Sequence, residues 1–145
     1  MTEGPTIEEV TDLAAPLAIR AAVFIGEQNV SLADEVDGRD GDCLHWLVTD
    51  PEGPVATLRV LPKGDVAKIQ RVAVLRRARG TGLGAALMRH AMAALAARGF
   101  RRATLGAQTD AIGFYARLGF VARGPVYDDA GIPHRDMDRD LGAIG

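Results

Sequence analysis

RRARGTGLGAALMRHAM, residues 76–92, directly follows the end of the apolar run KIQRVAVL and places glycines at positions 80, 82 and 84 behind a cluster of arginines. Glycine adopts positive φ easily and lets a ligand approach the main chain closely. A helix that begins behind such a turn adds free N–H groups and a partial positive charge. The stretch therefore predicts a strand, a glycine turn and a helix that together bind an anion, most naturally a diphosphate.

Three kinds of phosphate ligand compete for this turn. A nucleoside triphosphate favours G-x-x-x-x-G-K-[ST], which the chain lacks. The letters GTGLGA do fit the dinucleotide fingerprint G-x-G-x-x-G/A, but that fingerprint follows the first strand of its unit and needs an acid about 20 residues later. Arg101 and Arg102 stand there instead and would suit a 2′-phosphate, so an NADP-binding module is one alternative. Coenzyme A is the third ligand, and a glycine-rich helix start without any ligand is the remaining interpretation.

The rest of the chain predicts a single domain, residues 1–145, of the α/β (α+β) class with a mixed sheet. Seven segments have the apolar or alternating pattern of strands, namely residues 6–10, 43–50, 53–62, 66–75, 100–108, 120–129 and 132–141. Helices are predicted at residues 12–28, 80–99 and 109–119, and residues 29–42 predict a polar loop or a short helix.

Composition narrows the class of protein further. Hydrophobic residues make up 48% of the 145 residues, charged residues 25%, and the net charge is -2, as in soluble globular domains. The single cysteine, Cys43, excludes a disulfide framework and a zinc site of its own, so we expect no metal and a cytoplasmic location. The chain has no apolar run of about 18 residues, which argues against a membrane protein. The basic stretch lacks interleaved aromatic residues, which argues against nucleic-acid binding.

The small net charge hides a segregation of charge along the chain. Residues 66–108 contain nine lysines or arginines and no acid, whereas residues 27–42 contain six acids and one arginine. The basic segment predicts a surface for anions, and the acidic loop at residues 34–42 predicts a rim that attracts cations. This pattern favours a primary amine as a binding partner, either a polyamine-like small molecule or an exposed amino group on a peptide.

Three motifs in register resemble the GNAT superfamily of N-acetyltransferases. VAVLRRARGTGLGAALM is similar to the acyl-CoA motif R/Q-x-x-G-x-G/A, with Arg77, Gly80 and Gly82 on its fixed positions. GFYARLGF is similar to the family's N/Q…FYxxxGF element. The segments AVFIGEQNV…DEVDGRD, LGAQTDAIGFYARLGF and VYDDAGIPHRDM further resemble the small bacterial ElaA-type branch. Together these similarities cover nearly the whole chain.

The resemblance implies a sheet of about seven strands, splayed between the fourth and fifth, with about four helices and acetyl-CoA in the gap. Backbone groups of residues 72–74 would bind the pantetheine, and the glycine turn would surround the pyrophosphate. The residues implied to bind acetyl-CoA are Val72, Ala73, Val74, Arg77, Ala78, Arg79, Gly80, Thr81, Gly82, Leu83, Gly84, Gln108 and Tyr115. Members of the superfamily often form homodimers, but no strip of this sequence demands one.

The implied reaction is direct attack of an amine on the thioester in a ternary complex. Tyr115 falls where many relatives place a tyrosine beside the sulfur, so it is the expected proton donor to the leaving thiolate. The proton acceptor is open, because Gln70 stands near the position where many relatives carry a glutamate. Glu27 is the first candidate base, ahead of His45 and His134, and a water chain is an alternative. The residues expected on the acceptor side are Glu27, Gln28, His45, Gln70 and His134.

A second function from a different class is an acyl-CoA-binding sensor that regulates a partner protein and turns over little. Gln70, in place of a strand-four glutamate, favours the sensor, whereas Tyr115 favours the enzyme. Turnover on a panel of amines separates the two, and titration with both cofactors tests the NADP-binding alternative.

Overall fold

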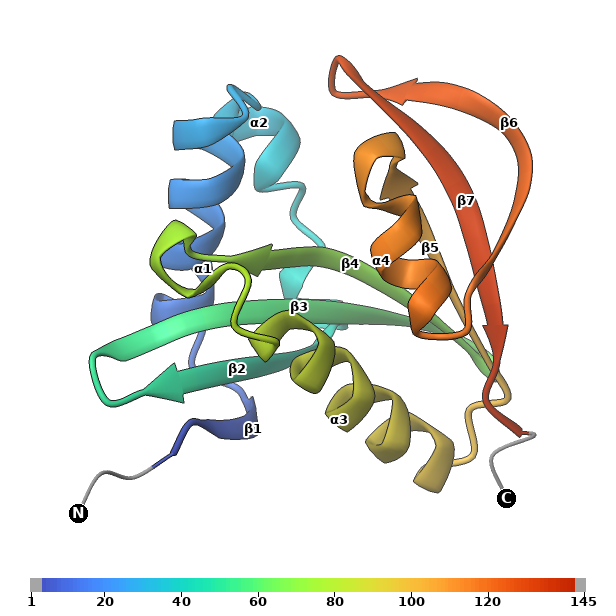
Figure 1. Cartoon of the computed structure of the whole chain (residues 1–145), viewed down its shortest axis with the longest axis horizontal. Helices are drawn as coiled ribbons and strands as arrows, with labels where there is room; N and C mark the ends of the chain where they lie inside the picture. Colours follow the sequence, from blue (N-terminus) through green and yellow to red (C-terminus); the bar gives the residue numbers. More distant parts are fainter. Residues whose placement is uncertain (1–3, 143–145) are drawn as a thin grey trace.

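The computed structural model describes residues 4–142, which form one seven-stranded sheet with the strand order β1-β2-β3-β4-β5-β7-β6 (Figure 1). The strands are β1 (Thr6–Val10), β2 (Leu44–Asp50), β3 (Gly53–Lys63), β4 (Val66–Val74), β5 (Arg102–Gln108), β6 (Val121–Asp129) and β7 (Ile132–Asp140). Only β4 and β5 pair in parallel, and the other neighbours are antiparallel. The predicted mixed sheet of seven strands is confirmed.

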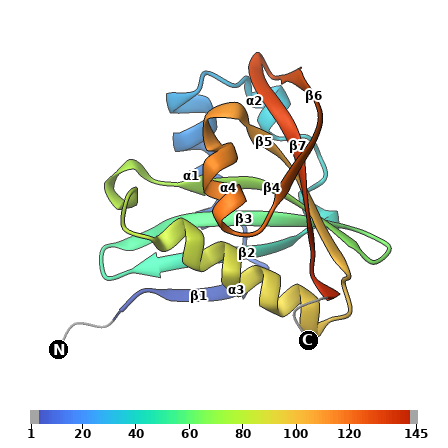
Figure 2. The ribbon, with the colours of Figure 1, turned by 45° about the vertical axis from the view of Figure 1, so that its right-hand side comes forward.

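Four α-helices occur within residues 4–142: α1 (Ala14–Arg20), α2 (Leu32–Glu35), α3 (Leu83–Ala97) and α4 (Ile112–Arg117). A π-helical segment, η1 (Ala21–Glu27), continues α1, and short 3-10 turns lie at η2 (Asp40–Asp42), η3 (Arg76–Ala78) and η4 (Thr109–Ala111). Figure 2 shows α3 and α4 in front of the sheet and α1 and α2 behind it. No helix of the described residues is long and apolar enough to span a membrane.

Alternation along β2 divides the core between the two faces of the sheet. Trp46 and Val48 are buried in the larger cluster, together with the apolar stripe of α3. Leu47 points to the other face and packs with Ile19 and Val23 of the α1–η1 segment. This is the period-two pattern of a strand buried on both faces, and it explains why residues 44–48 are almost continuously apolar.

The sheet opens between β4 and β5, as the family resemblance implies. The two strands pair only over Val66–Lys68 and Arg102–Thr104, and beyond that point each follows its other neighbour. A bulge in β4 contributes to the divergence: its register against β3 shifts between Thr57 and Arg59, and Arg71 has a φ of 56°. A bulge adds a residue and bends its strand, so β4 turns away from β5 here.

Candidate active site

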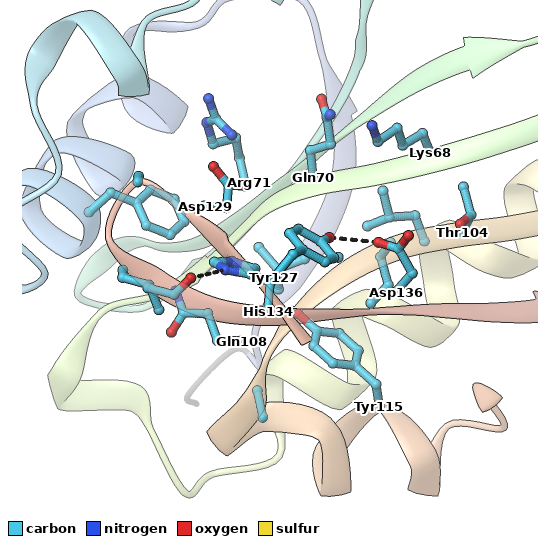
Figure 3. Close-up of a pocket in the computed structure, with 18 of the residues that line it drawn as sticks. Lys68, Gln70, Arg71, Thr104, Gln108, Tyr115, Tyr127, Asp129, His134 and Asp136 are labelled. Carbon is cyan, nitrogen blue, oxygen red and sulfur yellow. Dashed lines mark hydrogen bonds between the residues drawn. The ribbon is translucent and has the colours of Figure 1, made fainter. Parts of the chain in front are cut away.

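A cavity of about 540 Å³ occupies the opening between β4 and β5 (Figure 3). Its walls come from the end of η1, α2, the bulged half of β4, β5, α4 and the β6–β7 hairpin. Six residues predicted from the sequence line it: Gln28, Gln70, Val72, Gln108, Tyr115 and His134. Residues from five separate parts of the chain therefore meet at one place.

The free edge of β4 presents backbone groups to this cavity. The Leu75 amide donates to the Val55 carbonyl (2.9 Å), so Leu75 faces β3. Because hydrogen-bonding directions alternate along a strand, the backbone groups of Val72 and Val74 face the gap. Ala73 pairs with Thr57, and its backbone therefore faces β3, which corrects its prediction as a pantetheine contact.

The glycine turn between η3 and α3 leaves amide groups open at the helix N-terminus. Gly80 (φ 77°) and Gly82 (φ 84°) both have the left-handed conformation that glycine favours, and an added Cβ would meet nothing within 4 Å. The Ala86 amide, bonded to the Gly82 carbonyl (3.0 Å), donates the first hydrogen bond of α3. The preceding helical amides are thus available to a ligand, as the sequence predicts for an anion site. The Thr81 hydroxyl donates to the Ala78 carbonyl and so braces the turn.

Two residues of this region have partners within the fold that the sequence did not predict. The guanidinium of Arg77 bonds to Asp50 (2.7 Å) and Glu52 (3.1 Å) at the β2–β3 turn. Gly84 lies inside α3, where an added Cβ would approach Val74 (3.4 Å) and Phe114 (3.5 Å). That glycine serves helix packing and is not directed at a ligand.

Arg79 crosses the open end of the gap. Its Nε donates to the Val74 carbonyl (3.0 Å), and its Nη2 lies 2.7 Å from the Glu27 carboxylate. Glu27, predicted as the general base, does not line the cavity, and its carboxylate is paired with Arg79. Nearby, Gln108 Nε2 donates to Gln28 Oε1 (2.9 Å), which joins β5 to the end of the π-helical segment.

Tyr115 enters the cavity from α4 and is only 9% exposed (Figure 3). Its ring packs edge-to-face against Phe114 (5.0 Å between centroids) and Phe120 (6.0 Å). Burial raises the pKa of its phenol well above the ordinary value, because the phenolate would lose its hydration. The hydroxyl therefore stays protonated and can act as a proton donor.

The β6–β7 hairpin forms the opposite wall. His134 Nδ1 donates to the Ile132 carbonyl (2.7 Å), which leaves Nε2 as a hydrogen-bond acceptor. The Tyr127 ring stacks on the imidazole at 6.0 Å, and its hydroxyl donates to Asp136 (2.6 Å). Burial, together with this hydrogen bond, raises the pKa of Tyr127 to about 12.

Sequence reasoning missed Tyr127 and Asp136. The pairing of Tyr127 with His134 in the hairpin register was the signal that could have found them. Alternation along β7 then places His134 and Asp136 on one face, toward the cavity.

The acidic loop does not form the free anionic rim that the sequence predicts. The Arg20 guanidinium, 1% exposed, bonds to Glu35 (2.6 Å) and Asp40 (2.6 Å). Arg59, 0% exposed, bonds to Asp37 (2.6 Å) and Asp40 (3.0 Å). Hydrogen bonds from Arg59 hold the pKa of the Asp37 carboxyl far below its ordinary value. Three of the loop's carboxylates therefore neutralise arginines of the fold.

His45 and Gln70 also find partners within the fold. His45, predicted on the acceptor side, is 4% exposed, hydrogen-bonds through Nε2 to the Asp40 carbonyl (2.9 Å) and does not line the cavity. Gln70 does line the cavity, but its Oε1 accepts from Arg59 Nε (3.0 Å). Of the three candidate bases, only His134 reaches the cavity.

A splayed parallel strand pair, an anion-binding helix start and an enclosed tyrosine define an acyltransferase of the acyl-CoA-binding class. The family model described as "Acetyltransferase (GNAT) domain" matches residues 11–141, and the chain belongs to this family. It is 37% identical over 123 residues to YjcF, an uncharacterized N-acetyltransferase of Bacillus subtilis, covering 84% of this chain and 88% of that one.

Two crystal structures agree with this assignment. Escherichia coli ElaA superposes with a TM-score of 0.83 at 32% identity, covering 93% of this chain and 99% of that one. An acyl-CoA N-acyltransferase from Pseudomonas aeruginosa superposes with a TM-score of 0.81 at 35% identity, covering 93% and 97%. The predicted resemblance, including its ElaA-type branch, is confirmed.

Proposed function

We propose that this protein transfers an acetyl group from acetyl-CoA to a primary amine by direct attack within a ternary complex. The observation that carries the proposal is the unpaired edge of β4, which leads from the open amides of α3 to the enclosed hydroxyl of Tyr115. Pantetheine amides can pair with the exposed backbone of Val72 and with the Val74 amide as an added strand would, while the Val74 carbonyl already accepts from Arg79. The turn at Gly80–Gly82 suits the pyrophosphate.

Acetyl-CoA, as co-substrate, supplies an acetyl group through a thioester. Tyr115 donates a proton to the sulfur as the carbon–sulfur bond breaks, which its protonated, enclosed phenol suits. His134 Nε2 accepts the proton that the amine loses as its nitrogen–carbon bond forms, because the ring's other nitrogen already donates to the Ile132 carbonyl. Solvent then takes the proton from His134 and returns one to Tyr115. We keep the cytoplasm as the expected location, because Cys43 is a free thiol.

Release of CoA thiol from acetyl-CoA, measured over a panel of primary amines, tests this proposal. Tyr115→Phe should lower kcat about 100-fold, the usual contribution of one positioned proton donor, while the acetyl-CoA dissociation constant stays unchanged. Phe114→Leu is the matched control on the same helix, because it alters packing beside the same ring but removes no proton donor.

Tight acetyl-CoA binding without turnover on any amine would instead support the acyl-CoA sensor. Gln70 favours that function, because its side-chain oxygen is bound to Arg59 and β4 presents no carboxylate to the cavity. A partner protein that co-purifies with this chain and dissociates when acetyl-CoA is added would further support a sensor.

A further inference from the structure

The closed end of the cavity contains a lysine without an acidic partner. Lys68 is the last residue of β4 that pairs with β5, opposite Thr104, and its half-buried side chain lines the cavity beside Gln70 (Figure 3). Among residues 4–142, no carboxylate forms an ion pair with it. A partly desolvated ammonium without a counter-charge is unfavourable, so this position is suited to an anionic group of a ligand.

The carboxylates nearest to this end are already engaged. Asp136 accepts from Tyr127 (2.6 Å) and lies 3.5 Å from Arg123 Nη1. Asp138 accepts from Thr104 (2.7 Å) and is also paired with Arg123. These two carboxylates share Arg123, so the group is close to neutral once Lys68 is included, but Lys68 itself has no direct ion pair within the described part of the chain.

The register of the sheet orders the groups along the cavity. On β5 and β7 the pairs run from Gln108–His134 through Gly106–Asp136 to Thr104–Asp138. Lys68 is level with Thr104, and hence four strand positions from His134. At about 3.3 Å per residue this is roughly 13 Å between backbone positions, before either side chain extends into the space.

We infer that the acceptor amine also carries a carboxylate, which Lys68 binds at the closed end of the cavity while the amine faces His134. This inference rests on the proposed function and names its substrate class: an amino acid or a short peptide with a free carboxyl end. A single carboxylate can pair with the Lys68 ammonium, which has no ion pair of its own among the described residues, whereas a doubly charged phosphate would be repelled more strongly by the neighbouring Asp136 and Asp138. Three of the five acids of the 34–42 loop pair with arginines of the fold, which weakens the reason to expect a polyamine.

Matched acceptors test the inference: dipeptides with a free carboxyl end and the same dipeptides with an amidated end. CoA release should show a KM about tenfold or more higher for the amides, the loss expected for one charge-assisted hydrogen bond. Lys68→Gln should remove this difference by raising the KM of the free acids alone, and Lys68→Arg should retain it. Lys63→Gln is the control, because it deletes the same charge from an exposed residue that also lines the cavity.

Each outcome has a defined meaning. Equal KM values for acids and amides in the wild type, or a difference that survives Lys68→Gln, would overturn the inference and leave the acetyltransferase proposal intact. If Lys63→Gln raises the KM of the free acids as much as Lys68→Gln does, the effect comes from the general electrostatic field of the site and not from direct contact with Lys68. That result would also overturn the inference. If neither the free acids nor the amides support release of CoA, the proposed function itself is overturned. An unchanged KM for acetyl-CoA in each variant reports that the fold is retained.

Discussion

The acidic segment, residues 27–42, and the basic segment, residues 66–108, differ in where their charges find partners. Glu35, Asp37 and Asp40 bond to the buried Arg20 and Arg59, so the acidic segment is mainly an internal ion network. The basic segment keeps open main-chain amides at the start of α3 and an unpaired lysine in the cavity. Charge that the fold itself neutralises stabilises the scaffold, and charge left without a partner remains available to ligands.

The largest expected effect is on stability, from Arg59→Met. This change leaves Asp37 without its main partner next to the core and Asp40 with Arg20 alone, and breaking such a network costs about 3–5 kcal/mol of unfolding free energy. Urea denaturation measures it. Arg77→Met is the matched control: its ion pairs lie at the surface, so its effect should be much smaller. Similar losses in the two variants would contradict the distinction between the segments.

The next effect concerns ligand binding at the turn. Gly82→Ala should raise the KM of acetyl-CoA about tenfold, because alanine resists the φ of 84° and its methyl group stands where a diphosphate approaches. Gly99→Ala, at the other end of α3, has a φ of 95° and equally open surroundings. Both variants should lose about 1 kcal/mol of stability, but only Gly82→Ala should affect the KM. A KM that rises equally in both would place the diphosphate elsewhere.

The internal ion network should lose stability at acidic pH and keep it near neutral pH. Arg59 holds the folded-state pKa of Asp37 below its unfolded value, which for aspartate is about 3.9. The resulting stability is fully present above that unfolded value and is lost as the pH falls through the lower folded value. Unfolding free energies measured from about pH 6 down to about pH 2 should therefore fall below about pH 4. Asp37→Asn should show a shallower decline, and an unchanged slope would rule out this carboxyl as a contributor.

The smallest effect is expected for Glu27→Gln. This carboxylate pairs with the half-exposed Arg79 outside the cavity, so kcat should change less than about fivefold, the equivalent of the upper range for a surface ion pair. His134→Gln should lower kcat far more with the same acceptor. A collapse of kcat in the Glu27 variant would restore that residue as the base and remove His134 from the mechanism.

Much of the fold follows from local pattern. The alternation around Trp46, the apolar stripe of α3 and the glycine turn each depend on neighbours in the chain, so strands and helices appear close to their predicted positions. The π-helical continuation of α1 was beyond such reasoning, because residues 21–27 have an ordinary helical composition. The splay between β4 and β5 entered through the family resemblance alone.

Only some of the residues predicted for the candidate site line the cavity. Tyr115 and Gln108 were found because they lie in motifs, whereas Glu27 and His45 were assigned to a cleft that neither reaches. Their actual partners, Arg79 and the Asp40 carbonyl, belong to other segments, and no spacing in the sequence announces such contacts.

The sequence by itself determined the strand–glycine turn–helix unit, the periodic burial of its elements and the membership of an acetyltransferase family. These features are local, since backbone preference and hydrophobic period act over a few residues. Only the tertiary structure decided which charges are neutralised and which remain open, because an ion pair joins residues that are far apart in the chain. That distinction is the basis for the proposal that the acceptor binds between His134 and Lys68.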